Sequence, residues 1–227
     1  EKSGKMETLK KAISLNNKLK KIKLDFSDKL FKDIHAAFGG HMNTLIVGGA
    51  PIDPDTIRGL EDLGFKVIQG YGLTECAPIA ALNKDDWSKA DSAGLPLPGV
   101  TLNVIDPDEN GVGEITVTGA NVMMGYYKDP ELTASVLKDN TFYTGDLGYL
   151  DKDNFLHITG RKKNVIVTAN GKNIFPEELE TYLDRNDFIK ESVVCGVFNE
   201  KKNDYDLVAL IVPDDEKFAE YYHGEYT

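Results

Sequence analysis

Residues 44–75 read TLIVGGAPIDPDTIRGLEDLGFKVIQGYGLTE, and their pattern decides the fold class of this part of the chain. The apolar run Thr44–Val47 stops at two glycines and predicts a buried strand. An Asp-Pro pair at 53–54 predicts the start of a helix, because the carboxylate caps it and proline suits its first turn. Phe65–Ile68 predicts a second strand, which Gly70 ends. Strand, helix and strand in this order predict a parallel pair with a right-handed crossover, as in an α/β fold.

Two glycine-containing loops, 48–51 and 70–75, follow the two predicted strands. Ligands of open α/β sheets bind beyond the carboxyl ends of the strands, so both loops are candidate binding elements. Glycines let a backbone approach a ligand closely, and Tyr71 offers a flat face for a purine. Thr74 offers a hydroxyl and Glu75 a carboxylate that suits Mg²⁺. In the alternative interpretation Tyr71 belongs to the core and Glu75 is simply exposed.

The sequence changes character after residue 92. Glycines, prolines and short β-type runs predict a small β-barrel or sandwich, with a helix only at 130–138. His157 alternates with apolar neighbours on a predicted strand, so we expect its side chain at the surface. Beyond residue 163, a strand, a tight turn at 170–171, a helix and two strands predict a small α+β unit.

Composition narrows the functional classes. The 227 residues are 41% hydrophobic and carry a net charge of −11, which is typical of a soluble globular protein and argues against a nucleic-acid partner. The two cysteines fit neither a disulfide framework nor a zinc site, and this predicts a cytoplasmic protein. Residues 6–23 predict a lysine-rich amphipathic helix. Such a helix could associate weakly with a membrane surface, or pack an apolar stripe on the core with solvated lysines outside.

Two further segments could contact a nucleotide. In Tyr143-Thr144-Gly145-Asp146, the aspartate could accept two hydrogen bonds from a ribose diol, or be an ordinary turn residue. In Gly160–Lys163, Arg161 could reach a ribose or a phosphate, or belong to a solvated basic turn.

Taken together, these segments resemble the adenylate-forming superfamily of acyl-CoA synthetases, peptide-synthetase adenylation domains and luciferases. The matching blocks occur in the family's order: Gly48–Pro51, Tyr71–Pro78, Gly119–Tyr127 with Pro130-Glu131, Tyr143–Asp146, and Gly160–Glu178. Within the last block, Asn164–Glu178 looks most like bacterial long-chain fatty-acid–CoA ligases. The resemblance implies activation of a fatty acid with ATP and Mg²⁺ as an acyl-adenylate, followed by transfer to CoA.

The resemblance also implies a role for individual residues in nucleotide binding. The backbone of Gly49, Ala50 and Pro51 would lie along the adenine, on which Tyr71 would stack. The remaining nucleotide contacts would come from Thr74 on phosphate, Glu75 on Mg²⁺, and Asp146 with Arg161 on the ribose.

Other residues would serve the acyl and CoA steps. Lys163 matches the family's hinge position, and Gly171 would lie near the path of the pantetheine thiol. Gly72 and the stretch Ala77–Ile79 would help line the acyl pocket. The partners implied are therefore small molecules, and nothing in the sequence indicates an oligomeric state.

The implied fold is the remainder of a large domain followed by part of a small one. We expect residues 1–91 to form part of a βαβ sheet subdomain, 92–160 a β-barrel subdomain, and 161–227 the start of a C-terminal α+β domain. The sequence contains neither the family's phosphate loop ending in Pro-Lys-Gly nor its C-terminal lysine motif. We therefore expect a C-terminal fragment that is inactive alone. The alternatives are an adenylation domain for another acid with a carrier-protein acceptor, and a non-catalytic nucleotide-binding module.

Overall fold

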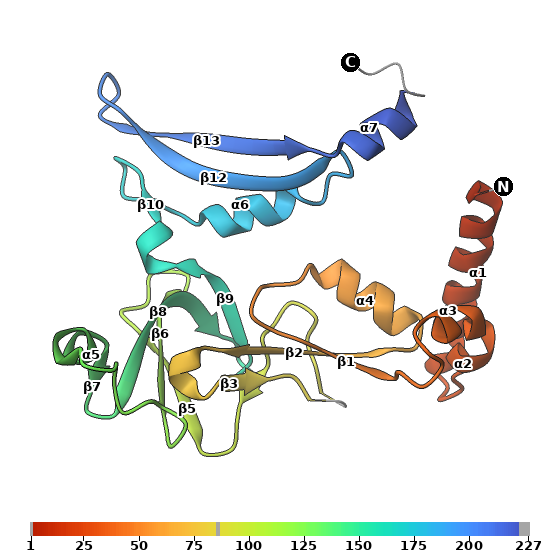
Figure 1. Ribbon diagram of the computed structural model, residues 1–227, viewed down its shortest axis with the longest axis horizontal. Coiled ribbons are helices and arrows are strands. Elements are labelled where there is room, and N and C mark those ends of the chain that lie inside the picture. The colour runs from red at the N-terminus through yellow and green to blue at the C-terminus, as the bar shows by residue number, and fades with distance from the viewer. Residues whose placement is uncertain (1, 85–86, 223–227) are drawn as a thin grey trace. The chain divides into compact units, whose positions relative to one another are not determined.

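The computed structural model describes residues 2–84 and 87–222 (Figure 1). The chain divides into two compact units. The first unit contains residues 1–101, 120–124 and 152–156, and the second contains residues 102–119, 125–151 and 157–227. The predicted boundaries at 91/92 and 160/161 stay a prediction. No helix among the described residues has both the length and the apolar character needed to cross a bilayer.

The first unit is built on a four-stranded sheet with the order β1-β2-β3-β4. The strands are β1 Thr44–Val47, β2 Lys66–Gly72, β3 Ile79–Leu82 and β4 Leu95–Pro96. The pair β1–β2 is parallel and is connected by α4 (Pro54–Asp62), whose buried Ile57 faces the core, so the predicted βαβ unit is confirmed. The pairs β2–β3 and β3–β4 are antiparallel.

Two details of this sheet differ from the prediction. Strand β1 is not buried, because it is an edge strand of the described sheet and alternates between exposed and half-buried residues, with Ile46 strongly exposed. Strand β2 does not end before Gly70 but continues to Gly72, since the antiparallel partner β3 continues its ladder. The glycines of the candidate ligand segment therefore lie in a strand rather than in a loop.

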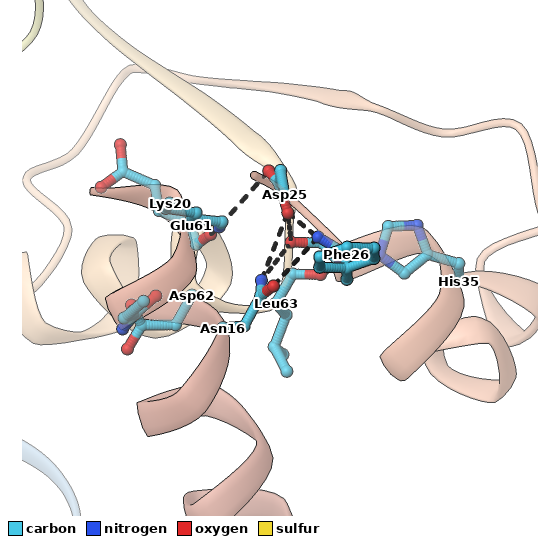
Figure 2. A network of polar contacts seen from close by, with 10 residues as sticks. Asn16, Lys20, Asp25, Phe26, His35, Glu61, Asp62 and Leu63 are labelled. Carbon is cyan, nitrogen blue, oxygen red and sulfur yellow. Dashed lines mark hydrogen bonds and ion pairs between the residues drawn. The ribbon is translucent and has the colours of Figure 1, made fainter. Parts of the chain in front are cut away.

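Helices α1 (Lys2–Lys20), α2 (Ser27–Leu30) and α3 (Lys32–Ala37) are joined to the end of α4 by polar contacts (Figure 2). Asn16 of α1 is fully buried, accepts a hydrogen bond from Phe26 N (3.0 Å) and donates to Ser27 Oγ (2.9 Å) and Asp25 Oδ1 (3.2 Å). Lys20 Nζ donates to the carbonyl of Glu61 (3.0 Å). Polar side chains of α1 thus attach this helix to the segment 25–27 and to the end of α4.

The apolar stripe predicted for α1 is only partly covered. Met6 is exposed, and so is Ile22, which lies in a turn two residues past the end of α1, whereas Leu9 and Ile13 are half-buried. The interpretation of this helix as an apolar stripe on the core is therefore wrong at both ends.

The second unit contains a five-stranded sheet with the order β5-β6-β8-β7, in which β9 also pairs with β8. Its strands are β5 Val100–Ile105, β6 Gly113–Gly119, β7 Leu137–Lys138, β8 Thr141–Leu150 and β9 Leu156–Arg161, and helix α5 spans Pro130–Val136. Ile115, Val117 and Phe142 are its buried core. This half-barrel sheet corresponds to the predicted small barrel.

The predicted α+β elements follow the half-barrel sheet along the chain. They are the 3-10 turn η2 Lys162–Asn164, the antiparallel pair β10 Ile166–Val167 and β11 Asn173–Ile174, helix α6 Pro176–Leu183, the antiparallel hairpin β12 Ile189–Asn199 and β13 Asp204–Pro213, and helix α7 Asp215–Tyr221. Glu180 on α6 accepts a hydrogen bond from Val194 N on β12 (2.8 Å), which fixes the helix on one face of the hairpin.

Candidate functional site

The turn after β2 presents Tyr71, Thr74 and Glu75. Strand β2 ends at Gly72, the 3-10 turn η1 spans Thr74–Cys76, and the chain returns along β3. A Cβ on Gly72 would lie 1.8 Å from the carbonyl oxygen of Pro78, so only glycine lets the two backbone segments approach this closely. Thr74 is exposed, whereas Tyr71 and Glu75 are half-buried.

Asn121 stabilises this turn by hydrogen bonds to its backbone. This residue was not identified from the sequence. Its side-chain amide donates hydrogen bonds to the carbonyl of Cys76 (3.0 Å) and to that of Ile79 (3.1 Å). Two residues later, Met123 N donates to the carbonyl of Glu75 (2.8 Å). The only sequence signal was its place within the block Gly119–Tyr127. These three bonds tie the backbone at Glu75, Cys76 and Ile79 to the segment 121–123.

The loop 48–51 lies beside the end of β2, as the parallel pairing predicts. Val47 pairs with Gln69, and a Cβ on Gly48 would lie 3.5 Å from the carbonyl oxygen of Gly70. Gly49 has a φ of +86°, a left-handed conformation that favours glycine. The loop is exposed, so its backbone is accessible to a flat ligand.

Cys76 is a buried thiol in the same turn. Burial, and to a smaller extent the neighbouring charge of Glu75, raises the pKa of Cys76 to about 11. A thiol with so high a pKa stays neutral near pH 7 and is a poor nucleophile. Cys76 therefore supports the turn by packing rather than by chemistry.

In the second unit, a bulge in β8 presents Asp146. Glu114 on β6 pairs with Leu147 and Thr116 pairs with Tyr143, so residues 144–146 lie opposite Ile115 alone. Gly145 takes a left-handed φ of +71° within this bulge. Bulges of this kind re-aim side chains and occur often beside active sites.

Backbone groups in the bulge form hydrogen bonds with side chains in place of the regular strand-to-strand bonds. Thr144 Oγ1 donates to the carbonyl of Ile115 (2.7 Å) and accepts from Asp146 N (3.0 Å). Gly145 N donates to Oε1 of Glu114 (3.1 Å). Neither Thr144 nor Glu114 was predicted to have this role, because the sequence does not show which backbone groups a bulge leaves unpaired.

The Asp146 carboxylate meets Arg161 at the end of β9. Arg161 Nε lies 2.8 Å from Asp146 Oδ1; the aspartate side chain is 6% exposed and the arginine 49% exposed. A buried carboxylate beside a solvent-accessible guanidinium is a suitable partner for a sugar diol, because the carboxylate accepts and the guanidinium donates hydrogen bonds. The structure therefore brings together two of the residues predicted to bind ribose.

Lys163 and Gly171 lie further along the chain. Lys163 is exposed in η2, and Gly171 lies in the turn between β10 and β11 with a φ of +80°. Gly171 N donates to the carbonyl of Thr168 (2.8 Å), which closes the turn. Their hinge and thiol-path roles stay predictions.

The candidate residues fall into both units. Loop 48–51 and the Tyr71–Glu75 segment belong to the first unit, whereas Asp146, Arg161, Lys163 and Gly171 belong to the second. That Tyr71 and Asp146 bind the same adenosine therefore stays a prediction. Among the described residues, no three His, Cys, Asp or Glu side chains group as ligands for a metal. A single carboxylate such as Glu75 still suits Mg²⁺, which is often held by one or two carboxylates together with substrate phosphates.

The chain is similar to known acid–CoA ligases. FadD15 of Mycobacterium bovis, a long-chain-fatty-acid–CoA ligase, is 37% identical over 171 residues, which are 75% of this chain and 28% of that protein. An indoleacetate–CoA ligase of Aromatoleum aromaticum is 40% identical over 177 residues, 74% of this chain and 34% of that protein. The chain thus spans about a third of the curated relatives' length.

A solved structure and a family match complete the comparison. The o-succinylbenzoate CoA synthetase MenE of Bacillus subtilis, in complex with ATP and magnesium ion, superposes with a TM-score of 0.68 at 26% identity, covering 86% of this chain and 44% of that one. Residues 8–127 match the family described as AMP-binding enzyme. This match includes more than half of the 227 residues, and the chain therefore belongs to the AMP-binding enzyme family.

Proposed function

We propose that the chain is part of an ATP-dependent acyl-CoA synthetase that activates a long-chain fatty acid as an acyl-adenylate and transfers the acyl group to CoA. The observation that carries the proposal is the β8 bulge, which presents the buried Asp146 carboxylate beside Arg161 at 2.8 Å. This pair suits a ribose diol and occurs in a chain of the AMP-binding family.

The chemistry follows from the poor electrophilicity of a carboxylate. The carboxylate oxygen attacks the α-phosphorus of ATP and pyrophosphate leaves, which gives a mixed anhydride that a thiol can attack with release of AMP. Mg²⁺ would supply charge stabilisation on the phosphates. Glu75 is the carboxylate that would hold the ion, and Thr74 would contact a phosphate through its exposed hydroxyl.

Four segments would contact the adenosine. Tyr71 would stack on the base, and the exposed backbone of Gly49, Ala50 and Pro51 would lie along its edge. Asp146 would accept hydrogen bonds from both ribose hydroxyls while Arg161 donates to the sugar. In this arrangement the Arg161–Asp146 ion pair of the structure shares its carboxylate with the ligand.

The acyl and thiol steps would use the remaining candidates. Gly72 and residues 77–79 would line the acyl pocket, and the absence of charged side chains at these positions favours an apolar acid. Gly171 would lie near the thiol path, and Lys163 would be the hinge about which the C-terminal region turns between the two half-reactions. Residues 6–23 would associate at most weakly with a membrane surface.

A substrate panel tests the proposal. Long-chain, short-chain, aryl and amino acids are each incubated with ATP, Mg²⁺ and CoA and the full-length gene product, and AMP formation is measured. We expect the highest kcat/KM with a long-chain fatty acid. A preference for an aryl acid would overturn the chain-length assignment, and the curated indoleacetate–CoA ligase makes this the natural rival. No AMP with any acid would overturn the ligase assignment.

The 227-residue chain itself provides a second test. Because its sequence lacks the phosphate loop and the C-terminal lysine motif of the family, we expect no pyrophosphate release from ATP and a fatty acid. Pyrophosphate release from this chain alone would show that the adenine and ribose contacts are sufficient for adenylation, contrary to the proposal.

A further inference from the structure

Glu114 uses its two carboxylate oxygens on two different segments. Oε1 accepts the backbone N–H of Gly145 at 3.1 Å, directly before Asp146, and Oε2 accepts Lys162 Nζ at 2.7 Å, directly after Arg161. The glutamate side chain is only 13% exposed, whereas Lys162 is 64% exposed. Glu114 therefore touches the chain neighbours of both residues that are candidates for ribose binding.

The bond to Gly145 is an essential part of the bulge. The three residues 144–146 oppose one residue of β6, so the N–H groups of Gly145 and Asp146 both bond to side chains. Thr144 serves the second of these groups through a hydroxyl that also reaches the carbonyl of Ile115. Without Glu114, the Gly145 N–H would lose its acceptor at the point where a left-handed glycine sets the direction of Asp146.

The bond to Lys162 has a different role. The hydrogen bond and charge of Glu114 raise the pKa of Lys162, so this lysine stays protonated near neutral pH. Because Lys162 is largely exposed, the ion pair is partly screened by water and contributes little to stability by itself. Its effect is to neutralise a half-buried carboxylate and to hold η2 against β6 beside Arg161.

We infer that Glu114 is a positioning residue for nucleotide binding, which fixes the direction of Asp146 through the backbone of Gly145. The inference rests on the proposed ribose contacts of Asp146 and Arg161. The length of the Glu114 side chain matters more than its charge, because the Gly145 N–H needs an acceptor oxygen at the position that Oε1 occupies. A glutamine keeps that oxygen, whereas an aspartate keeps the charge but withdraws the oxygen by one methylene.

The test compares AMP with 2′,3′-dideoxyadenosine monophosphate on the 227-residue chain, with NMR chemical-shift titration as a readout for weak binding. We expect the wild type to favour AMP by at least about 10-fold, because one charge-assisted hydrogen bond supports that ratio and the dideoxy analogue lacks both ribose hydroxyls. Glu114→Ala and Glu114→Asp should bring this ratio close to one and shift the amide proton of Gly145. Glu114→Gln should keep both the ratio and the shift, and so should the matched control Glu109→Ala, at an exposed turn position.

The outcomes separate this inference from the proposed function. If the wild type discriminates and Glu114→Asp discriminates equally well, the positioning role is wrong while the ribose contacts stand. If Glu114→Gln loses the preference as fully as Glu114→Asp, the charge of Glu114 is needed as well as its reach, and the inference that reach is decisive is wrong. If the wild type itself binds both nucleotides equally, the ribose role of Asp146 fails, and the Glu114 inference fails with it.

Discussion

Substitution by alanine should destabilise the protein at Gly72 and stabilise it at Gly59. A Cβ on Gly72 would lie 1.8 Å from the carbonyl oxygen of Pro78 and 2.8 Å from Ile79 Cα, both backbone atoms of the segment leading into β3. A relaxed carbon–oxygen contact is about 3.3 Å, so the strands would have to separate by about 1.5 Å. On α4, a Cβ on Gly59 meets nothing within 4 Å.

These distances set the expected magnitudes. Gly72→Ala should cost about 3 kcal/mol, as expected for severe overpacking that displaces backbone. Gly59→Ala should stabilise by about 0.5–1 kcal/mol, because alanine in a helix loses less chain entropy on folding than glycine does. Both positions lie in the first unit, so the two variants test the same added methyl group within one unit.

Urea unfolding followed by the fluorescence of the single tryptophan, Trp87, measures both effects. Trp87 packs edge-to-face on Phe155 at 5.2 Å, and both rings belong to the first unit, so the signal reports on that unit. At about 1–3 kcal/mol per molar urea, the Gly72→Ala midpoint should fall by at least about 1 M while the Gly59→Ala midpoint rises. A Gly72→Ala midpoint equal to that of the wild type would refute the close approach of β2 and β3.

Three further changes test other parts of the structure. Asp146→Asn keeps the side chain's size but removes the charge that pairs with Arg161, so AMP affinity measured by calorimetry should fall about 10-fold; unchanged affinity would contradict the ribose role. Burial raises the pKa of Asp25, but hydrogen bonds and a lysine charge outweigh it and hold the pKa below its ordinary value. The stability contributed by Asp25 is therefore present above about pH 4 and lost as the pH falls further, so Asp25→Asn should flatten the acid limb of urea midpoints measured from pH 6 to pH 2. A thiol reagent at pH 7 should label half-buried Cys195 well before buried Cys76, whose pKa is about 11, and equal labelling rates would argue against the buried turn.

The sequence predicted the fold wherever one local pattern determined the element. The Asp-Pro start of α4 and the apolar runs on either side of it were sufficient to predict the parallel pair β1–β2. Burial was predicted less well, because it depends on what packs on an element. His157, which we expected at the surface, is only 9% exposed, since Tyr149 stacks on its ring at 4.7 Å and Asp151 Oδ2 lies 3.2 Å from Nε2.

The candidate site was predicted by residue type but not by the residues that support it. Asp146 and Arg161 were singled out from two separate segments, and the structure pairs them. Asn121 and Glu114 were not, because each acts on backbone groups of a segment far away in the sequence: Asn121 on Cys76 and Ile79, and Glu114 on Gly145. A periodic pattern shows which face of a strand is apolar, but it does not show where the register of two strands shifts.

Each of the two candidate ligand segments, Tyr71–Glu75 and the β8 bulge at Asp146, lies at a register shift. In the first unit the pairing of β2 with β3 shifts between Tyr71 and Gly72, which leaves Ala80 without an opposite residue. In the second unit the pairing of β6 with β8 shifts around Asp146. A regular ladder directs side chains alternately to fixed faces, whereas a bulge re-aims a side chain. Because each irregularity depends on hydrogen bonds to the backbone, substitutions at Asn121 or Glu114 should weaken binding without touching the ligand, whereas changes on the regular parts of the same strands should affect stability first.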